Sequence, residues 1–548
     1  SSSAASDVYK RQLLKIAWHK FAVEYHFNIP KDFLVRYWQK YWHERGNIKK
    51  YGFRYLNPED VREYATWRSY LPMIEYKNAF YDITFLSDQE IKNVDKYPIL
   101  IQDVLDINKI TTKYICIVDS GCCIYNLSFL DERYFKESDI VYFDYDFLKE
   151  DGTRINPQLL PDYSYDTLRG YNYIGNCWLV KTDVMRQFDK EAWNPYGWLL
   201  RLSDKGYTWE HVPQILYGTY SPERNQKDIL NGYLQEAFPN SQIISNQDGI
   251  TNTVQYSIEG SPLVSIVIPM RDGIEDTKKC ISSIYEKTTY KNFEIIIADN
   301  GSQKLESKEY ITQVKNMYTN IHVISIDIPF NYSRINNIAI RNKARGEFIV
   351  LLNNDTSVIT NNWLEQMVGY AQLKHVGSVG VKLLYPDMTL QHAGVIAGKS
   401  GVASHRYYRK DYAEKDYMHA LSIPYDVACC TAACLMFRRS CFDEVGGLNE
   451  ELAVNFNDVD FGFKLLDRGY HNIFLPSVEL FHYESKSRGL DITKEKLIRY
   501  RREVKYMQEK WSIYLKHDPY YSNLFDKAYD YRLKLGVLKE DLDDSSEK

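Results

Sequence analysis

The sequence lacks any apolar run near the ~20 residues that a membrane-spanning helix requires, and no signal-peptide pattern opens it. We therefore expect any membrane association to be peripheral. It also lacks an excess of one charge, because 68 basic residues accompany 73 acidic residues and the net charge is -5. Since the two signs are interspersed, no overall field favours a nucleic acid as partner, and we expect none.

Cysteine is scarce and has no recognisable spacing. The cysteines lie singly in apolar runs or as the neighbours Cys122 and Cys123 and Cys429 and Cys430, and no pair is spaced as CxxC. Their number, 9, is odd, which disfavours both a disulfide framework and a zinc site. We expect reduced thiols in a cytoplasmic protein.

Material for packed cores is plentiful. Hydrophobic residues make up 44% of the 548 residues, and a prior of ~150 residues per domain predicts about three units.

The opening letters SSSAASDVYKRQ resemble a translated cloning adapter, so the natural N-terminus is expected to be missing. We predict six segments: an adapter-derived segment (1–12), a helical lead-in (13–60), a first domain (61–225), a linker (226–260), a second domain (261–490) and a helical tail (491–548).

Short apolar runs alternate with helical patterns after residue 260. The runs are LVSIVI (263–268), FEIIIA (293–298), IHVISI (321–326) and EFIVLL (347–352). Runs of this kind are typical of buried strands in a mostly parallel sheet. The intervening segments 275–287 and 332–345 space their apolar residues as one helical face. The pattern predicts an α/β fold with a Rossmann-like sheet.

Polar residues follow these runs at the strand ends, where open α/β sheets bind their ligands. They occur after the first, second and fourth runs. We expect these polar residues, together with Pro269, which directly follows the first run, to contact a bound ligand: Asp272, Asp299, Asn300, Asn354 and Asp355.

Two of these carboxylates suit particular tasks. Asp299, next to a flexible turn at Gly301, can accept hydrogen bonds from a pyrimidine edge, although Asn-Gly is also an ordinary turn. Asp355 can bind Mg²⁺ or Mn²⁺ through oxygen. A turn or a helix cap before Trp363 would explain Asp355 equally well.

Two further candidates lie beyond residue 450. Asp458 and Asp460 begin a helical pattern, where one carboxylate can serve as general base while the other caps the helix or binds an acceptor. Simple capping remains an alternative for both. His482 could bind a metal ion through its imidazole, but a lone histidine is often only structural.

In their order along the chain, these elements resemble glycosyltransferase family 2, which has the GT-A fold. The resemblance covers about 230 residues and rests on VSIVIP, ADNGS, ARGEFIVLLNNDT, LQHAGVIAG, TAACLMFRR, EVGGLNEEL, NDVDFGFKL and HYESKSRG, which begin at residues 264, 298, 344, 390, 431, 444, 457 and 482.

The resemblance implies a role for each candidate. Asp299 is similar to the residue that binds the nucleobase, Asp355 to the last position of the DxD-type metal motif, Asp458 to the catalytic base, and His482 to an additional metal ligand. The chain departs from the family by having Asn-Asn-Asp in the first motif and Asn-Asp before the helix. These departures imply that metal affinity is modest and that His482 contributes a larger part of metal binding.

The resemblance also implies the reaction. It is an inverting transfer from a UDP- or dTDP-linked sugar, with Mn²⁺ or Mg²⁺, to a glycan or lipid-linked glycan. Asp458 would deprotonate the acceptor hydroxyl. We expect an enzyme of bacterial surface-polysaccharide synthesis, with a hexosyl or rhamnosyl sugar, at the inner face of the cell membrane. A non-catalytic glycan-binding scaffold and a nucleotidyltransferase are the alternatives. The sequence indicates no oligomeric state.

The first half repeats the second in outline. KYICIVDSG (113–121) aligns with EFIVLLNND (347–355), and DKGYTWEHVP (204–213) with DRGYHNIFLP (467–476). In this register Gly121 replaces Asp355 and Pro195 replaces Asp458, while no histidine replaces His482. We predict a degenerate GT-A-like domain, without a clear counterpart of VSIVIP, that presents acceptor glycan or holds a partner. A second active transferase is the competing interpretation.

The spacing of apolar residues in the tail (491–548) predicts an amphipathic helix. Its apolar stripe is expected to pack on the second domain, or its basic residues to contact a membrane surface. The stripe comprises Leu497, Tyr500, Val504, Met507 and Trp511.

Overall fold

The computed structural model describes residues 56–537, apart from 72–81, 92–98, 102–104, 120, 126–137, 221–224, 415 and 484–492. The segment predicted to derive from an adapter, nearly all of the predicted lead-in, most of HYESKSRG and the acidic C-terminal end lie outside the described residues. Internal contacts divide the chain into one unit of Leu56–Glu484 with Glu503–Lys548 and another of Ser1–Tyr55 with Ser485–Arg502. Of the latter, the structure describes residues 493–502, where the C-terminal helix begins.

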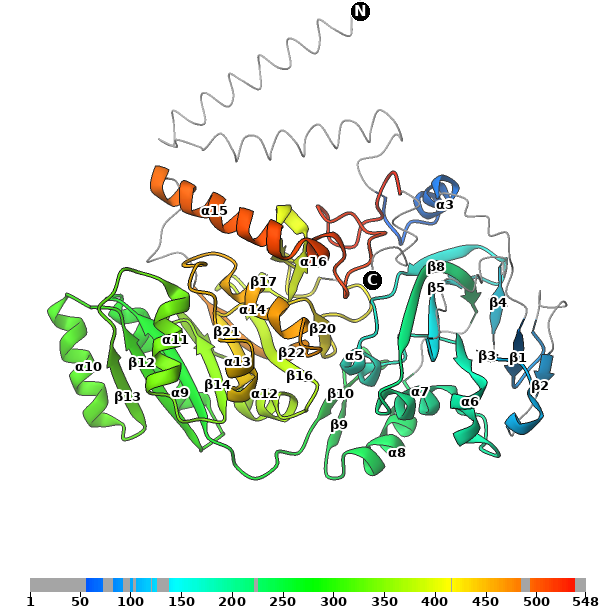
Figure 1. Ribbon diagram of the computed structural model, residues 1–548, viewed down its shortest axis with the longest axis horizontal. Helices are drawn as coiled ribbons and strands as arrows, with labels where there is room; N and C mark the ends of the chain where they lie inside the picture. The colour runs from blue at the N-terminus through cyan, green and yellow to red at the C-terminus, as the bar shows by residue number, and fades with distance from the viewer. Residues whose placement is uncertain are drawn as a thin grey trace, which may run out of the picture. The chain divides into compact units, whose positions relative to one another are not determined.

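The first domain is built on a mixed sheet with strand order β2-β1-β3-β7-β5-β8-β4, and β6 pairs with β5 (Figure 1). Its elements are α3 (Val61–Tyr70), β1 (Ile83–Ser87), β2 (Ile99–Ile101), η1 (Ile107–Lys109), β3 (Tyr114–Val118), β4 (Cys122–Ile124), β5 (Ile140–Leu148), β6 (Arg154–Gln158), α5 (Tyr165–Gly170), β7 (Cys177–Lys181), α6 (Thr182–Met185), η2 (Arg186–Phe188), α7 (Pro195–Ser203) and β8 (Trp209–Thr219). The segment that follows contains α8 (Lys227–Ala237), β9 (Gln242–Ser245) and β10 (Asn252–Gln255).

The second domain has a larger sheet with strand order β13-β12-β11-β14-β21-β16-β22-β15 (Figure 1). Its elements are β11 (Val264–Met270), α9 (Ile274–Lys287), β12 (Phe293–Asp299), α10 (Leu305–Met317), β13 (Ile321–Ser325), α11 (Tyr332–Asn342), β14 (Phe348–Leu352), β15 (Thr356–Val358), α12 (Trp363–Ala371), β16 (Val376–Leu384), β17 (Leu390–His392), β18 (Val395–Ala397), η3 (Lys399–Gly401), β19 (Ala403–His405), β20 (Tyr425–Val427), β21 (Cys434–Arg438), α13 (Arg439–Glu444), α14 (Asn457–Leu466) and β22 (His471–His482). In addition, β17 pairs with β16 and β20 with β22.

The predicted α/β class is confirmed. The apolar runs form β11 to β14, and the pairs β11–β12, β11–β14 and β12–β13 are parallel. Both faces of β14 are buried, which explains its unbroken apolar sequence. Beyond β14 the sheet turns antiparallel at β21. The carboxyl ends of β11, β12 and β14 therefore lie at one edge of the sheet.

The predicted internal repeat is confirmed by topology. The order β3-β7-β5-β8-β4 in the first sheet matches β14-β21-β16-β22-β15 in the second. A hydrogen bond is repeated as well: the Asp119 amide donates to the Asn176 carbonyl at 2.8 Å, and the Asn353 amide donates to the Ala433 carbonyl at 3.0 Å. The sequence register placed Asp119 over Asn353, as the structure does.

The expectation that the first half has no clear counterpart of VSIVIP is wrong. Strand β1, with the sequence ITFLS, runs parallel to β3 as β11 runs parallel to β14. Every residue of β1 is buried, so the strand is recognised by its packing in the sheet, and many sequences could satisfy that packing. The strand went unrecognised because its sequence lacks the proline that ends VSIVIP, although polar residues follow both strands.

In the first domain, other residues stand at the places of Asp355, Asp458 and His482, in structure as in sequence. Thr356 pairs with His482 where the other sheet pairs Cys122 with Thr219, so Thr219 stands in the place of His482. Pro195 begins α7, the counterpart of α14, and proline is well suited to a first helical turn.

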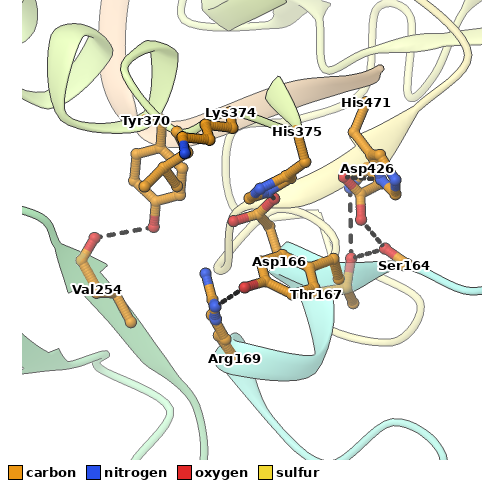
Figure 2. Close-up of polar contacts among 12 residues, drawn as sticks. Ser164, Asp166, Thr167, Arg169, Val254, Tyr370, Lys374, His375, Asp426 and His471 are labelled. Atoms are coloured by element: carbon orange, nitrogen blue, oxygen red, sulfur yellow. Dashed lines mark hydrogen bonds and ion pairs between the residues drawn. The ribbon is translucent and has the colours of Figure 1, made fainter. Parts of the chain in front are cut away.

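Polar contacts join α5 of the first domain to the second domain (Figure 2). Asp166 accepts from His375 at 2.8 Å, and Ser164 donates to Asp426 at 2.5 Å. Both carboxylates are almost fully buried. Buried charges need partners of this kind, so the contact is specific.

The C-terminal helices are α15 (Lys494–Lys510) and α16 (Ser512–Lys516). Met507 and Trp511 are buried with Val459 and Phe463 of α14, which confirms the predicted packing for this part of the stripe. Within the described residues, no helix combines the length and apolar character needed to cross a membrane.

Candidate active site

The turns after β11 and β12 are tied together by side chains. Asp299, the last residue of β12, accepts from the amide and hydroxyl of Ser302 at 3.0 and 2.6 Å. The same hydroxyl oxygen accepts from the amide of Asp272 at 2.9 Å. Two predicted ligand contacts, Asp272 and Asp299, are thus brought together at the edge of the sheet.

Asp272 also fixes the next loop. Its Oδ1 accepts from the amides of Gln303 and Lys304 at 3.1 and 3.0 Å. These donors, the Lys304 amide foremost, hold the pKa of the Asp272 carboxyl below its ordinary value. Asp272 therefore stays ionised and shapes the rim.

Asn300 lies behind this rim and is buried. Its amide nitrogen donates to the carbonyls of Ile326 and Ile328 at 2.9 and 2.8 Å. The neighbouring Gly301 has φ +73°, and a Cβ there would lie 2.7 Å from an oxygen of Asp327. The glycine is required by both backbone conformation and space.

Asp355 and His482 meet as the metal hypothesis requires. Oδ1 of Asp355 lies 3.1 Å from Nε2 of His482. The side-chain amide of Asn353 also lies 3.3 Å from this nitrogen, and Oε1 of Gln391 lies 2.6 Å from the other ring nitrogen, Nδ1. His482 is thus held on both sides, with 8% of its surface exposed.

These residues could hold a divalent cation. A carboxylate oxygen next to an imidazole nitrogen suits Mn²⁺ better than Ca²⁺. Within the part of the chain that the structure describes, no group of three or more His, Cys, Asp or Glu side chains converges as a metal site. Asp355 and His482 would therefore share the ion with ligands from elsewhere, such as a diphosphate and water.

Asp458 lies in the first turn of α14 and remains half-exposed. Its Oδ2 accepts from the backbone amide of Ala432 at 3.1 Å, and its Oδ1 from the amide of Val459 at 2.9 Å. The carboxylate is held in place, and a half-exposed carboxylate can reach a bound hydroxyl group.

Asp460, by contrast, is fully buried. It accepts from the indole of Trp511 at 2.8 Å, and ammonium groups of Lys464 and Lys510 lie 3.5 Å away. Of the two carboxylates, Asp460 contacts the C-terminal segment, and Asp458 is the one that remains accessible.

Residues 431–433 connect Asp458 to the turn that carries Asp355. The Ala432 amide donates to Asp458, and the next carbonyl, that of Ala433, accepts from the amide of Asn353. The Thr431 amide lies 3.4 Å from Nε2 of His392. One short segment thus contacts the Asp458 carboxylate and the turn that carries Asp355.

His392 supports this segment as a neutral side chain. Burial, with the nearby His405 and Arg406, lowers its pKa well below the ordinary value. Its Nε2 accepts from the amides of Gly394 and Thr431, so Nδ1 carries the hydrogen and donates to Nδ1 of His405 at 2.8 Å.

Glu503 of α15 steadies the loop before α14. Its carboxylate accepts from the amides of Val454 and Asn455 at 3.1 and 3.2 Å. The C-terminal helix therefore packs against the segment that leads into Asp458.

The remaining predicted residues lie at the same edge. Asn354 donates to Thr277 of α9 at 3.0 Å, and Pro269 is half-buried in β11 opposite Ala298. Sequence reasoning assigned no role to Gln391 or His392, although both belong to the motif LQHAGVIAG. It also missed Ala432, because a backbone amide has no signature in the sequence.

The comparison with protein families agrees with this geometry. Residues 265–446 match the model of Glycosyl transferase family 2. The matched range contains β11, β12 and Asp355 but ends before Asp458 and His482. The GT-A fold implied by the resemblance is consistent with the mixed sheet.

Two bacterial proteins match this chain over 65% or more of its length. The chain is 35% identical over 409 residues to uncharacterized protein y4gI of Sinorhizobium fredii, covering 70% of this chain and 45% of that protein. It is 30% identical over 382 residues to the O-antigen biosynthesis protein RfbC of Myxococcus xanthus, covering 65% of this chain and 29% of that one. The chain thus spans less than half the length of these two relatives. A shorter match, 38% identical over 61 residues, covers 11% of this chain and 20% of an N-acetylglucosaminyl-diphospho-decaprenol L-rhamnosyltransferase of Mycobacterium tuberculosis.

Proposed function

We propose that this chain, whose residues 265–446 match the model of Glycosyl transferase family 2, moves a sugar from a nucleoside diphosphate to a hydroxyl group of a glycan or lipid-linked glycan. The reaction is metal-dependent and inverts the configuration at the anomeric carbon. The observation that carries the proposal is the connection of Asp355 and His482, through residues 431–433, to Asp458.

The residues divide the work by their chemistry. Asp299 accepts hydrogen bonds from the pyrimidine base of a UDP- or dTDP-linked sugar at the rim formed with Asp272. Mn²⁺ or Mg²⁺, held by Asp355 and His482, supplies positive charge that neutralises the departing diphosphate. Asp458 removes the proton of the acceptor hydroxyl, which then attacks from the face opposite the diphosphate.

The two domains have different tasks in this proposal. Residues 261–490 perform the transfer. Residues 61–225 retain the sheet but have Gly121, Pro195 and Thr219 at the three catalytic positions, so they present acceptor glycan or hold a partner instead. One active site per chain follows, and the linker 226–260 connects the two domains.

The setting of the reaction is part of the proposal. A relative named for O-antigen biosynthesis and another named as a rhamnosyltransferase support synthesis of a bacterial surface polysaccharide. The donor sugar is then a rhamnosyl or hexosyl group. A lipid-linked acceptor places the enzyme at the inner face of the cell membrane, in peripheral contact with it.

A donor screen tests the proposal. The full chain is incubated with UDP-, dTDP- and GDP-sugars and Mn²⁺, with and without a chelator, and release of nucleoside diphosphate is measured. We expect release from a pyrimidine-linked donor that stops when the chelator is added. No release and no stabilisation by any nucleotide with Mn²⁺ would favour the glycan-binding scaffold.

A further inference from the structure

Gln391 lies on the side of His482 that faces away from Asp355. Its carbonyl oxygen Oε1 is 2.6 Å from Nδ1 of His482, and 3% of its surface is exposed. Gln391 lies in β17 between Leu390 and His392, which both pair with β16, so the residues on either side of it are held by the sheet.

This contact determines which nitrogen of His482 carries the hydrogen. An amide oxygen only accepts hydrogen bonds, so Nδ1 must be the donor. In the neutral ring, the lone pair is then on Nε2, the nitrogen that lies 3.1 Å from Oδ1 of Asp355. This tautomer is the one in which Nε2 can bind a cation that Asp355 also binds.

We propose that Gln391 is a positioning residue for the metal site: it fixes the ring orientation and the tautomer of His482. The inference rests on the proposed function, because it needs a cation between Asp355 and His482. Partners of this kind, behind a metal-binding histidine, contribute ~10–100-fold to metal affinity. Gln391 itself touches neither cation nor substrate.

The test measures Mn²⁺ binding rather than turnover. Free Mn²⁺ is titrated by electron paramagnetic resonance in the presence of UDP and the full chain. In Gln391→Leu the acceptor is lost and the volume is nearly kept, so the Kd for Mn²⁺ should rise ~10–100-fold. In Gln391→Glu an oxygen acceptor remains, so the Kd should stay close to that of the wild type.

Two further variants separate positioning from folding. Gln158→Leu is the matched control, because Gln158 is also a buried glutamine but lies on β6 of the first domain. Its Kd should not change. His482→Ala combined with Gln391→Leu should bind Mn²⁺ no more weakly than His482→Ala alone, since Gln391 acts only through His482. Should Gln391→Leu fail to fold, Gln391→Asn removes the same contact by shortening the side chain.

The outcomes distinguish the inference from the function. An unchanged Kd in Gln391→Leu, with Mn²⁺ binding intact in the wild type, would overturn the positioning role and leave the proposed transferase standing. An additive loss in the double variant would overturn it too. If the wild type binds no Mn²⁺ with UDP, the metal-dependent function fails and the inference with it.

Discussion

Oδ1 of Asp355 and Nε2 of His482 lie 3.1 Å apart, one on the turn after β14 and the other at the end of β22. In the proposed metal site, His482 provides a large share of the binding, because Asp355 is the single carboxylate of its Asn-Asn-Asp motif. We predict that His482→Ala raises the Mn²⁺ concentration for half-maximal transfer at least ~10-fold.

The control for this variant is His322→Ala, which removes a half-exposed histidine on β13. Its Mn²⁺ dependence should match that of the wild type. Equal Mn²⁺ curves for His482→Ala and the wild type would remove His482 from the metal site.

Asp460 is predicted to matter for stability rather than for chemistry. It is buried against Trp511 and two lysines, so Asp460→Asn leaves these groups with a weaker acceptor. We expect a loss of ~2 kcal/mol in the free energy of unfolding, measured in urea. The transfer rate per folded molecule should change little, and a large loss of rate at unchanged stability would contradict the assignment.

Arg169 of α5 is predicted to stabilise the contact between the first domain and the segment 226–260 that follows it. Its buried guanidinium donates to the hydroxyls of Tyr233 and Tyr256 at 2.6 and 2.7 Å and lies 3.0 Å from Asp204. We expect Arg169→Met to lower the free energy of unfolding by ~3 kcal/mol, at the low end for a broken buried pair because Asp204 is partly exposed.

The matched control is Arg186→Met, since Arg186 pairs with Asp183 on the surface. Its free energy of unfolding should change by less than ~1 kcal/mol, as is usual for exposed pairs. Similar losses in the two variants would mean that the buried contacts of Arg169 add nothing.

His471 lies where Asp166 of the first domain contacts the second domain, and it makes the stability of this contact sensitive to pH. Burial opposes protonation of its ring, but the carboxylates of Asp426 and Asp166 outweigh burial and raise its pKa. A group whose pKa is higher in the folded state stabilises the fold at low pH, and this contribution is lost as pH rises through the folded pKa.

We therefore expect the melting temperature of the wild type to fall more between pH 6 and pH 8 (values chosen around the ordinary histidine pKa of ~6.5) than that of His471→Gln. Parallel melting curves for the two proteins across this range would show that protonation of His471 contributes nothing to folding.

The sequence predicted the parts of the site that follow buried strands. Asp299 stands directly after a run of apolar residues and Asp355 three positions after another, and the topology of parallel strands brings the ends of these strands together. Gln391 could not be assigned a role in the same way, because its contact with His482 joins residues 91 positions apart on separate strands. The Ala432 amide that holds Asp458 belongs to the backbone, where the residue type reveals nothing.

The internal repeat shows a similar limit. Its register identified Gly121 and Pro195 from the sequence, since the matching segments contain no gaps. Strand β1 escaped notice because many different sequences can fill a buried strand, and ITFLS, with Thr84 and Ser87, shares little with VSIVIP.

The most direct test of the whole account is transfer by Asp458→Asn. The substitution preserves one oxygen that can accept from the Ala432 amide and gives up the contact with the Val459 amide, so it removes the base with nearly the same side-chain shape. We predict that transfer falls ~10²–10⁴-fold while the Kd for UDP with Mn²⁺ stays within a few-fold of the wild type. Transfer at the wild-type rate, or a loss explained by weaker donor binding alone, would contradict Asp458 as the catalytic base.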